Sequence, residues 1–263
     1  MSKLTLNLKF NPMNDLVPDN WYENFFSGIN CELWEEVATP EWTEDEVNFL
    51  TDVLQVKPGD QLLDIPCGVG RHSVAFAKRG FQLTSVDISD EFVTKLSKRV
   101  RTEDLPVRII HGNILSVDLP GSFDGAFCMG NSFGYFDIEG MRTFVRKVAA
   151  GLKPGGRFVI NSAMVAESIL PNPPKLENFS FGDTTMEIDN IYIAEEGYMI
   201  SHILYNKETR PEKHSFKHYI FTLSEIRRLL ASANLRTTAV YNSTRKLPYQ
   251  VGDQQLFLVA EKR

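Results

Sequence analysis

One short segment combines residue types that can bind a nucleoside. Asp64-Ile65-Pro66-Cys67-Gly68-Val69-Gly70 contains two glycines one residue apart, and Asp87 follows further along the chain. Glycine has no side chain, so Gly68 and Gly70 let the loop backbone approach a ligand closely. An acidic residue at about this distance can accept hydrogen bonds from both hydroxyls of a ribose. The spacing predicts an adenosine-containing cofactor, and the alternative is a tight strand-to-helix turn with Asp87 solvated at a strand end.

Neighbouring residues separate the nucleoside cofactors from one another. The dinucleotide fingerprint requires a third glycine, and Ser73 stands at that position. The carboxylate of Asp64 would repel a pyrophosphate but suits a cationic methionyl amine or a sulfonium. The chain contains neither a Tyr-x-x-x-Lys pair for hydride chemistry nor a Gly-Lys-Ser/Thr phosphate loop. These features disfavour hydride transfer and phosphoryl transfer.

The elements that must position these residues follow an alternating pattern. Short apolar runs alternate with helix-like segments from residue 61 to 160, which is typical of βαβ units around a parallel sheet. We expect five strands in this part of the chain, at 61–66, 81–87, 107–113, 123–130 and 157–163. We expect helices at 71–80, 90–103 and 138–152, with 152–156 as a turn that ends the last helix.

The rhythm of the sequence changes after Pro171. Strand-like runs separated by a turn at Gly197 and a polar loop near 206–213 predict an antiparallel meander. An amphipathic helix at 224–235 and two last strands, around 236–243 and 254–261, then resume the earlier pattern. The aromatic-rich N-terminal segment is mostly helical in pattern. Trp21, Phe25 and Phe26 either form a flap over the site or simply fill the core.

Composition limits the classes of protein. The 263 residues are 43% hydrophobic and 24% charged, which fits one globular domain with an insertion. No apolar run is long enough to cross a membrane, and no leader pattern is evident. Cys31, Cys67 and Cys128 have no paired spacing, so reduced thiols are expected rather than disulfides or a metal site. The net charge of -6, with dispersed basic residues, disfavours nucleic acid and membrane partners. We expect a cytoplasmic protein, monomeric or homodimeric, that acts on a small molecule.

Several motifs in order resemble one known superfamily. They are Asp64-x-x-Cys67-Gly68-x-Gly70-Arg71, Asp87-Ile88-Ser89, Gly112-Asn113 and Leu152-Lys153-Pro154-Gly155-Gly156. Together they resemble the motif series of class I S-adenosylmethionine-dependent methyltransferases. Trp21-Tyr22-Glu23 with Phe25-Phe26, the run Cys67 to His72, and Asn131-Ser132-Phe133-Gly134-Tyr135-Phe136 resemble a bacterial small-molecule branch of it.

The resemblance implies an α/β fold with a Rossmann-like, seven-stranded mixed sheet whose last strand is antiparallel. We expect an N-terminal helical flap at 1–50 and the methyltransferase domain at 51–174 and 222–263. The antiparallel β insertion at 175–221 would cover the mouth of the active site.

The resemblance also implies a cofactor site for S-adenosylmethionine. Asp64, Gly68 and Gly70 would surround the methionyl part, Asp87 the ribose, and Ile88 the adenine. The remaining cofactor-site residues implied are Cys67, Arg71, Asn113, Ile114, Met129 and Gly130. Two residues depart from the family, which commonly has Gly at Pro66 and Asp at Asn113. The amide carbonyl of Asn113 can still bind the adenine amino group.

Methyl transfer from a sulfonium needs in-line placement, exclusion of water and sometimes a base. Tyr22, Asn131 and Tyr135 are the candidate catalytic residues, and Phe133 and Phe136 either wall the substrate or fill the core. The candidate bases are Tyr22, Tyr135, His72, His111 and His202, and no spacing selects among them; a structural role is the better interpretation of His72 and His111. His214 and His218 would share a strand face, but no metal is expected.

The predicted function is transfer of a methyl group to an unidentified small-molecule nucleophile, at nitrogen, oxygen or carbon. Two alternatives stay open on the sequence alone. One is a nicotinamide-dependent oxidoreductase, which Ser73 and the missing Tyr-Lys pair disfavour. The other is a non-catalytic module that binds a nucleoside.

Overall fold

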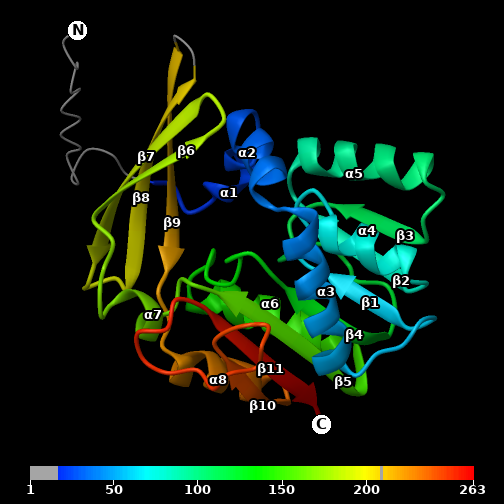
Figure 1. Ribbon diagram of the computed structural model, residues 1–263. Coiled ribbons are helices and arrows are strands. Elements are labelled where there is room, and N and C mark those ends of the chain that lie inside the picture. Colours follow the sequence, from blue (N-terminus) through cyan, green and yellow to red (C-terminus); the bar gives the residue numbers. More distant parts are fainter. Residues whose placement is uncertain (1–16, 208–209) are drawn as a thin grey trace, which may run out of the picture.

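A computed structural model describes residues 17–207 and 210–263. The described chain forms two β-sheets, with helices packed on the larger one and a four-stranded sheet standing to one side (Figure 1). The larger sheet has seven strands in the order β10-β11-β5-β4-β1-β2-β3. These strands are β1 (Gln61–Asp64), β2 (Gln82–Asp87), β3 (Val107–His111), β4 (Phe123–Cys128), β5 (Leu152–Ser162), β10 (Leu235–Tyr241) and β11 (Leu256–Lys262).

Strand directions in the larger sheet are mixed. β1 pairs in parallel with β2 and β4, and β3 and β5 extend the parallel set outward. β11 is antiparallel to both of its neighbours, β5 and β10. The expected seven-stranded Rossmann-like sheet with an antiparallel last strand is therefore confirmed.

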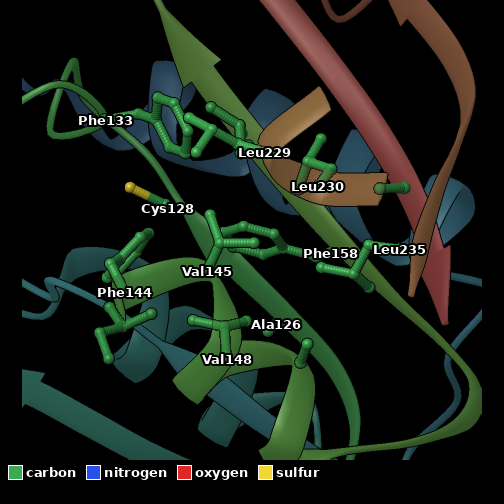
Figure 2. Packing of buried hydrophobic residues seen from close by; sticks show 14 of the residues in the cluster. Ala126, Cys128, Phe133, Phe144, Val145, Val148, Phe158, Leu229, Leu230 and Leu235 are labelled. Atoms are coloured by element: carbon green, nitrogen blue, oxygen red, sulfur yellow. The ribbon is translucent and has the colours of Figure 1, made fainter. Parts of the chain in front are cut away.

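Both faces of this sheet are covered, which explains why its central strands are apolar throughout. Leu62 faces the cluster that contains α3 (Pro40–Leu54) and α4 (Arg71–Lys78). Leu63, the next residue, faces the cluster that contains α6 (Ile138–Gly151) and α8 (Leu223–Ser232). Figure 2 shows part of this second layer, where Val145 of α6 lies beside Phe158 of β5 and Leu229 and Leu230 approach from α8.

Side-chain caps fix where the helices begin. The Ser89 hydroxyl accepts the backbone N–H of Phe92 and so caps α5 (Asp90–Thr102), which packs beside α4 through Leu96. Thr222 and Glu225 form a reciprocal capping box at the start of α8. Both helices were expected, but the one predicted to start at residue 224 starts at Leu223, with Thr222 as its N-cap.

The insertion is a separate sheet in the order β6-β7-β8-β9, as expected for an antiparallel meander. Its strands are β6 (Leu176–Phe181), β7 (Thr184–Ile193), β8 (Tyr198–Lys207) and β9 (Arg210–Tyr219). The predicted loop near 206–213 is wrong in extent, because cross-strand pairing continues to Lys207 and Arg210. The predicted turn at 152–156 is also wrong, since these residues belong to β5.

The N-terminal segment is helical, as expected, with α1 (Tyr22–Phe25), α2 (Ile29–Val37) and α3. In Figure 1, α1 and α2 lie between the four-stranded sheet and α5. The predicted flap boundary after residue 50 falls inside α3, whose Val47 and Leu50 are fully buried against the larger sheet. Residues 1–16 of the predicted flap lie outside the described residues. Among the helices of the described chain, none has the length and hydropathy needed to span a bilayer.

Candidate active site

A cavity opens beyond the carboxyl ends of β1, β2 and β4, below α1. This is where ligands bind in open parallel sheets, because the loops leaving the strands converge there. The cavity encloses about 1200 Å³, open mouth included. The predicted residues that line it are Tyr22, Cys67, Gly68, Arg71, Asp87, Ile88, Asn113, Ile114, Met129, Gly130 and Tyr135. Asp64, Gly70 and Asn131 do not line it.

Asp87 joins the end of β2 to the loop after β1. One carboxylate oxygen accepts the Gly68 N–H at 2.7 Å, and the other accepts the Ser89 N–H at 2.9 Å. Gly68 has φ of +54°, and a Cβ added there would meet no atom within 4 Å, so its backbone stays open toward the cavity. Burial raises the pKa of Asp87, although these N–H donors oppose that shift. Each carboxylate oxygen keeps a second acceptor position, which suits a pair of ribose hydroxyls.

Asp64 lies beneath the same loop rather than in the cavity. Its carboxylate accepts the Ser73 hydroxyl at 2.6 Å, and the Ser73 oxygen lies 2.6 Å from the Ser85 oxygen. Only 1% of Asp64 is exposed, and burial raises its pKa to about 7. Ser73 stands at the position of the third glycine of a dinucleotide site. Its hydroxyl contacts Asp64 of β1 and Ser85 of β2 and so links the two strands.

Gly70 shapes the loop from behind. It has φ of +72° at the start of α4, and a Cβ there would clash with the Leu96 side chain of α5. The residue is therefore required by the turn and by the contact between α4 and α5.

Arg71 and His72 share one buried carboxylate. Arg71 contacts Glu46 at 2.5 Å, and His72 Nε2 lies 2.9 Å from the same oxygen. Burial lowers the pKa of His72, so the neutral ring donates its Nε2–H to Glu46. Burial alone would raise the pKa of Glu46, but hydrogen bonds from His72 and Arg71 lower it below its usual value. The Arg71 guanidinium also lies 5.0 Å from the centre of the Trp42 ring.

The loop after β3 forms the side of the cavity expected to hold an adenine. Asn113 Oδ1 accepts the Leu115 N–H at 2.9 Å, which holds the amide in place. The same oxygen retains one acceptor position, and the amide nitrogen can donate. Ile88 and Ile114 supply apolar surface to the lining of the same cavity.

Aromatic side chains also line the cavity. Five of them come from the N-terminal segment and the loop after β4, and we call these five the aromatic wall: Tyr22, Phe26, Trp42, Tyr135 and Phe136. The Tyr22 and Phe136 rings meet edge to face with centres 5.0 Å apart. The Ser89 hydroxyl donates to the Phe26 carbonyl at 2.5 Å, and the Gly28 N–H donates to Glu91 at 2.9 Å. These two bonds attach the N-terminal segment to α5 above the site.

Asn131 has a structural position in the loop after β4. Its φ is +67°, and its side-chain carbonyl accepts the Ala163 N–H at 2.7 Å, which joins the ends of β4 and β5. Phe133 is 2% exposed, and Figure 2 shows it among the core residues, whereas Phe136 lines the cavity. Phe133 therefore fills the core, whereas Phe136 both lines the cavity and packs against the core cluster, and its contact with a substrate stays a prediction.

The candidate bases have different environments. Burial raises the pKa of Tyr135 well above its usual value, so its hydroxyl stays protonated at neutral pH. His111 donates to the Ile88 carbonyl and does not line the cavity. His202 is buried in the insertion, with Nδ1 2.7 Å from the Ser215 hydroxyl. His218 donates to the Phe133 carbonyl at 2.9 Å, and burial lowers its pKa to about 4.

Sequence reasoning missed several lining residues. Trp42 and Phe92 sit on helices with ordinary apolar spacing, so nothing in the pattern distinguishes them from core residues. Ser132 belongs to one of the motifs that resemble the superfamily, but no role was expected for it. Across residues 17–207 and 210–263, no group of three or more His, Cys, Asp or Glu side chains is placed to hold a metal ion.

Comparison with known proteins finds a matching family model and several similar proteins. Residues 62–156 match the family model described as a methyltransferase domain. The chain is similar to the glycine/sarcosine N-methyltransferase of Aphanothece halophytica, with 27% identity over 157 residues, which are 57% of this chain and 58% of that protein. The chain thus spans about half the length of the curated relatives it matches.

Solved structures share the fold at low identity. An S-adenosylmethionine-dependent methyltransferase from Clostridium acetobutylicum superposes with a TM-score of 0.74 at 15% identity, covering 88% of this chain and 94% of that one. An amino pentose methyltransferase from Micromonospora echinaspora, solved with S-adenosylmethionine bound, gives a TM-score of 0.68 at 18% identity, covering 91% and 99%. The likeness therefore extends well beyond the matched domain and includes most of both chains.

Proposed function

We propose that this chain is a class I S-adenosylmethionine-dependent methyltransferase that transfers a methyl group from S-adenosylmethionine to a small molecule. The match of residues 62–156 to a methyltransferase-domain model and the fold shared with solved methyltransferases support the proposal. The observation that carries the proposal is the position of Asp87. Its carboxylate lies at the end of β2, beside the open backbone of Gly68, and lines a cavity that continues to the aromatic wall. In a nucleoside bound to Asp87, the group attached to the ribose on the side away from the base would point toward the aromatic wall.

The residues present fit the cofactor. Asp87 keeps acceptor positions for two ribose hydroxyls, and Asn113 offers both an acceptor and a donor to the adenine edge. Cys67, Gly68 and Met129 surround the region between these groups and the wall, where the methionyl part would lie. When bound, S-adenosylmethionine supplies an electrophilic methyl group on a sulfonium.

The protein's own contribution is to orient the acceptor and exclude water. Methyl displacement needs the attacking atom in line with the methyl carbon, which is mainly a matter of positioning. The wall and the segment above it close the cavity on the acceptor side, while the hydroxyls of Tyr22, Ser132 and Tyr135 can orient a polar group. Tyr135 acts as a hydrogen-bond donor because its raised pKa keeps the proton in place. We further propose a cytoplasmic location, which the three free cysteines support.

Isothermal titration with S-adenosylmethionine, S-adenosylhomocysteine and NADH, each in a separate experiment, tests the cofactor assignment. We expect saturable binding of the first two and none of NADH. Binding of NADH alone would instead support the nicotinamide-dependent alternative. Formation of S-adenosylhomocysteine over a panel of small acceptors then separates an enzyme from a module that only binds the nucleoside.

A further inference from the structure

The cavity has two chemically different parts. Its floor comes from the loops after β1, β2 and β3, which present Gly68, Asp87 and Asn113. The aromatic wall comes from α1, the residue after it, α3 and the loop after β4. Since the floor supplies the polar groups that a nucleoside needs, the wall faces the remaining space, where the methyl acceptor must lie.

Among the described residues, the charged groups that line the cavity include no cation whose charge is left unbalanced to bind an acceptor carboxylate. Among the described residues that line it, the acidic and basic side chains are Arg71, His72 and Asp87. The charge of Arg71 is balanced by the buried Glu46 at 2.5 Å, and the neutral His72 donates to the same carboxylate. A carboxylate carried against the wall would be desolvated, and the described residues place no cation of unbalanced charge beside it, which is strongly unfavourable.

A neutral nitrogen acceptor can attack without first losing a proton, so it needs no base. Among the described residues at the cavity, the Tyr135 hydroxyl stays protonated and can donate a hydrogen bond, while the neutral His72, which is not part of the wall, donates Nε2–H to Glu46 and keeps its Nδ1 lone pair. A hydroxyl acceptor needs its proton removed as it attacks, whereas a neutral nitrogen already has a free lone pair. Positive charge that develops on nitrogen beside aromatic faces is stabilised by their π electrons.

We propose that the acceptor is a neutral, planar aromatic molecule that carries a nucleophilic nitrogen, and not a carboxylated amino acid. The inference rests on the proposed function and concerns the same site. The nitrogen lone pair forms the new bond to the methyl carbon while the carbon–sulfur bond breaks and its electrons stay on sulfur. The methylated nitrogen, now cationic, releases a proton to water where it carries one.

Matched pairs of acceptors test the proposal on the full chain. The probes are aniline, benzimidazole and 6-aminoquinoline, with 4-aminobenzoate and benzimidazole-5-carboxylate as carboxylated counterparts, and glycine and phenol. We expect S-adenosylhomocysteine and a methylated product from at least one neutral nitrogen probe. Its rate at neutral pH should exceed those of its carboxylated counterpart, glycine and phenol at least tenfold.

Two outcomes overturn the proposal. One is turnover of glycine or of a carboxylated probe as fast as that of its neutral partner. The other is failure of every neutral nitrogen probe although S-adenosylhomocysteine binds. If S-adenosylhomocysteine does not bind at all, the proposed function itself fails, so the two failures are distinguishable.

Glu46→Gln tests the charge argument. The substitution keeps the shape of the side chain but removes the charge that balances Arg71, so the binding of benzimidazole-5-carboxylate relative to benzimidazole should rise about tenfold. Glu44→Gln is the matched control on the same helix, because Glu44 is exposed and pairs with Arg79. An unchanged ratio in a folded Glu46→Gln protein overturns the proposal. If that variant does not fold, titration of the two probes into the wild-type complex with S-adenosylhomocysteine decides, and equal affinities overturn it.

Discussion

Asp87 is the residue whose side chain connects the cofactor loop to the open space of the cavity. Asp87→Ala removes the acceptor of the Gly68 and Ser89 N–H groups and the acceptors available to a ribose. Hydrogen bonds to a charged group contribute about 1.5–3 kcal/mol each. We therefore expect the Kd for S-adenosylhomocysteine, measured by calorimetry, to rise at least tenfold.

Asp118→Ala is a suitable control, because Asp118 is exposed and does not line the cavity. It should leave the Kd unchanged. Wild-type affinity in Asp87→Ala would contradict the assignment of this carboxylate to the cofactor.

Asp64 makes a different prediction, about stability and pH. Burial raises its pKa to about 7 in the folded protein, whereas an unfolded chain has a pKa of about 3.9. Between these values the unfolded chain has released the proton and the folded one still holds it. The folded state therefore loses stability as pH rises from about 4 to about 7. Asp64→Asn cannot ionise, and its side-chain carbonyl can still accept the Ser73 hydroxyl.

The free energy of unfolding of Asp64→Asn, relative to wild type, should rise between pH 5 and pH 8. About two pH units separate pH 5 from the folded-state pKa, so the wild-type protein should lose about 3 kcal/mol of stability relative to Asp64→Asn over this interval. Urea unfolding at both pH values measures it. Asp124→Asn is the control, because Lys153 and the Gln61 N–H outweigh burial and hold the pKa of Asp124 below its usual value. Its difference from wild type should not change over this interval, and the same constancy in Asp64→Asn would contradict the prediction.

At the scale of single residues, the sequence predicted which residues lie at or near the cavity better than it predicted what their side chains contact there. The spacing identified Asp87 and the Gly68 loop because each follows a strand whose carboxyl end faces the ligand. It could not show that Asp64 turns beneath the loop, because the sequence does not reveal that Ser73 and Ser85 would meet its carboxylate. Similarly, Asn131 lies next to the site but is committed to the Ala163 N–H.

At the scale of elements, the loop after β4 is held by the last strand of the insertion. The Tyr219 N–H donates to the Gly134 carbonyl at 2.8 Å, and His218 donates to the adjacent Phe133 carbonyl. A Cβ on Gly134 would lie 2.5 Å from His218 Nε2 and 2.7 Å from the Tyr219 carbonyl oxygen. The insertion therefore helps to place Tyr135 and Phe136 at the cavity.

Gly134→Ala should separate this loop from β9. Backbone strain at φ of +113° and the clash should together lower the free energy of unfolding by about 2–4 kcal/mol. The rate of methyl transfer should fall as the wall is displaced. Gly182→Ala is the matched control, since its φ of +53° is also strained but no atom lies within 4 Å. Equal effects of the two substitutions on stability and rate would show that the loop does not depend on this contact.

The strand–helix alternation was predictable because both faces of the larger sheet are covered, so its strands are apolar runs. The residues at which helices and strands begin and end were less predictable. Residues 152–156 contain Pro and two glycines, which favour a turn, yet they belong to β5, where Leu152 pairs with Phe123 and the register shifts before Arg157 pairs with Gly125. The β8–β9 hairpin contains polar residues because it lies at the surface, and composition alone made these residues resemble a loop.

At the scale of the whole molecule, one aromatic cluster links the insertion, the N-terminal segment and the site. Trp21 lies at its centre, 5% exposed, with ring contacts to Tyr135 and to Phe216 of β9. Sequence reasoning left open whether Trp21 forms a flap or fills the core. Trp21 is buried in a small cluster that the N-terminal segment and the insertion form together, and the role of this segment as a flap stays a prediction. No local pattern predicts this, since the three parts are distant in sequence.

We predict that the N-terminal segment moves when a ligand as large as S-adenosylmethionine enters, and the Gly28 N–H to Glu91 bond is one of its attachments to α5. Glu91→Ala removes that bond, which contributes about 1 kcal/mol, so the open state should become about fivefold more populated. Cys67 reports opening because it lines the cavity and is 7% exposed. We expect a thiol reagent to label it about fivefold faster in the variant and more slowly when S-adenosylhomocysteine is bound.

Cys128 provides the internal control for this measurement. It is fully buried beneath α6 and α8, so its labelling requires a larger opening than that of Cys67. Its rate should stay the same in Glu91→Ala, provided that the variant affects the N-terminal segment and not the sheet. Equal acceleration of both cysteines would mean that Glu91 stabilises the whole fold, and acceleration of neither would mean that the N-terminal segment opens without breaking this bond. Faster labelling of Cys67 alone would identify movement of the N-terminal segment as the step that admits the cofactor.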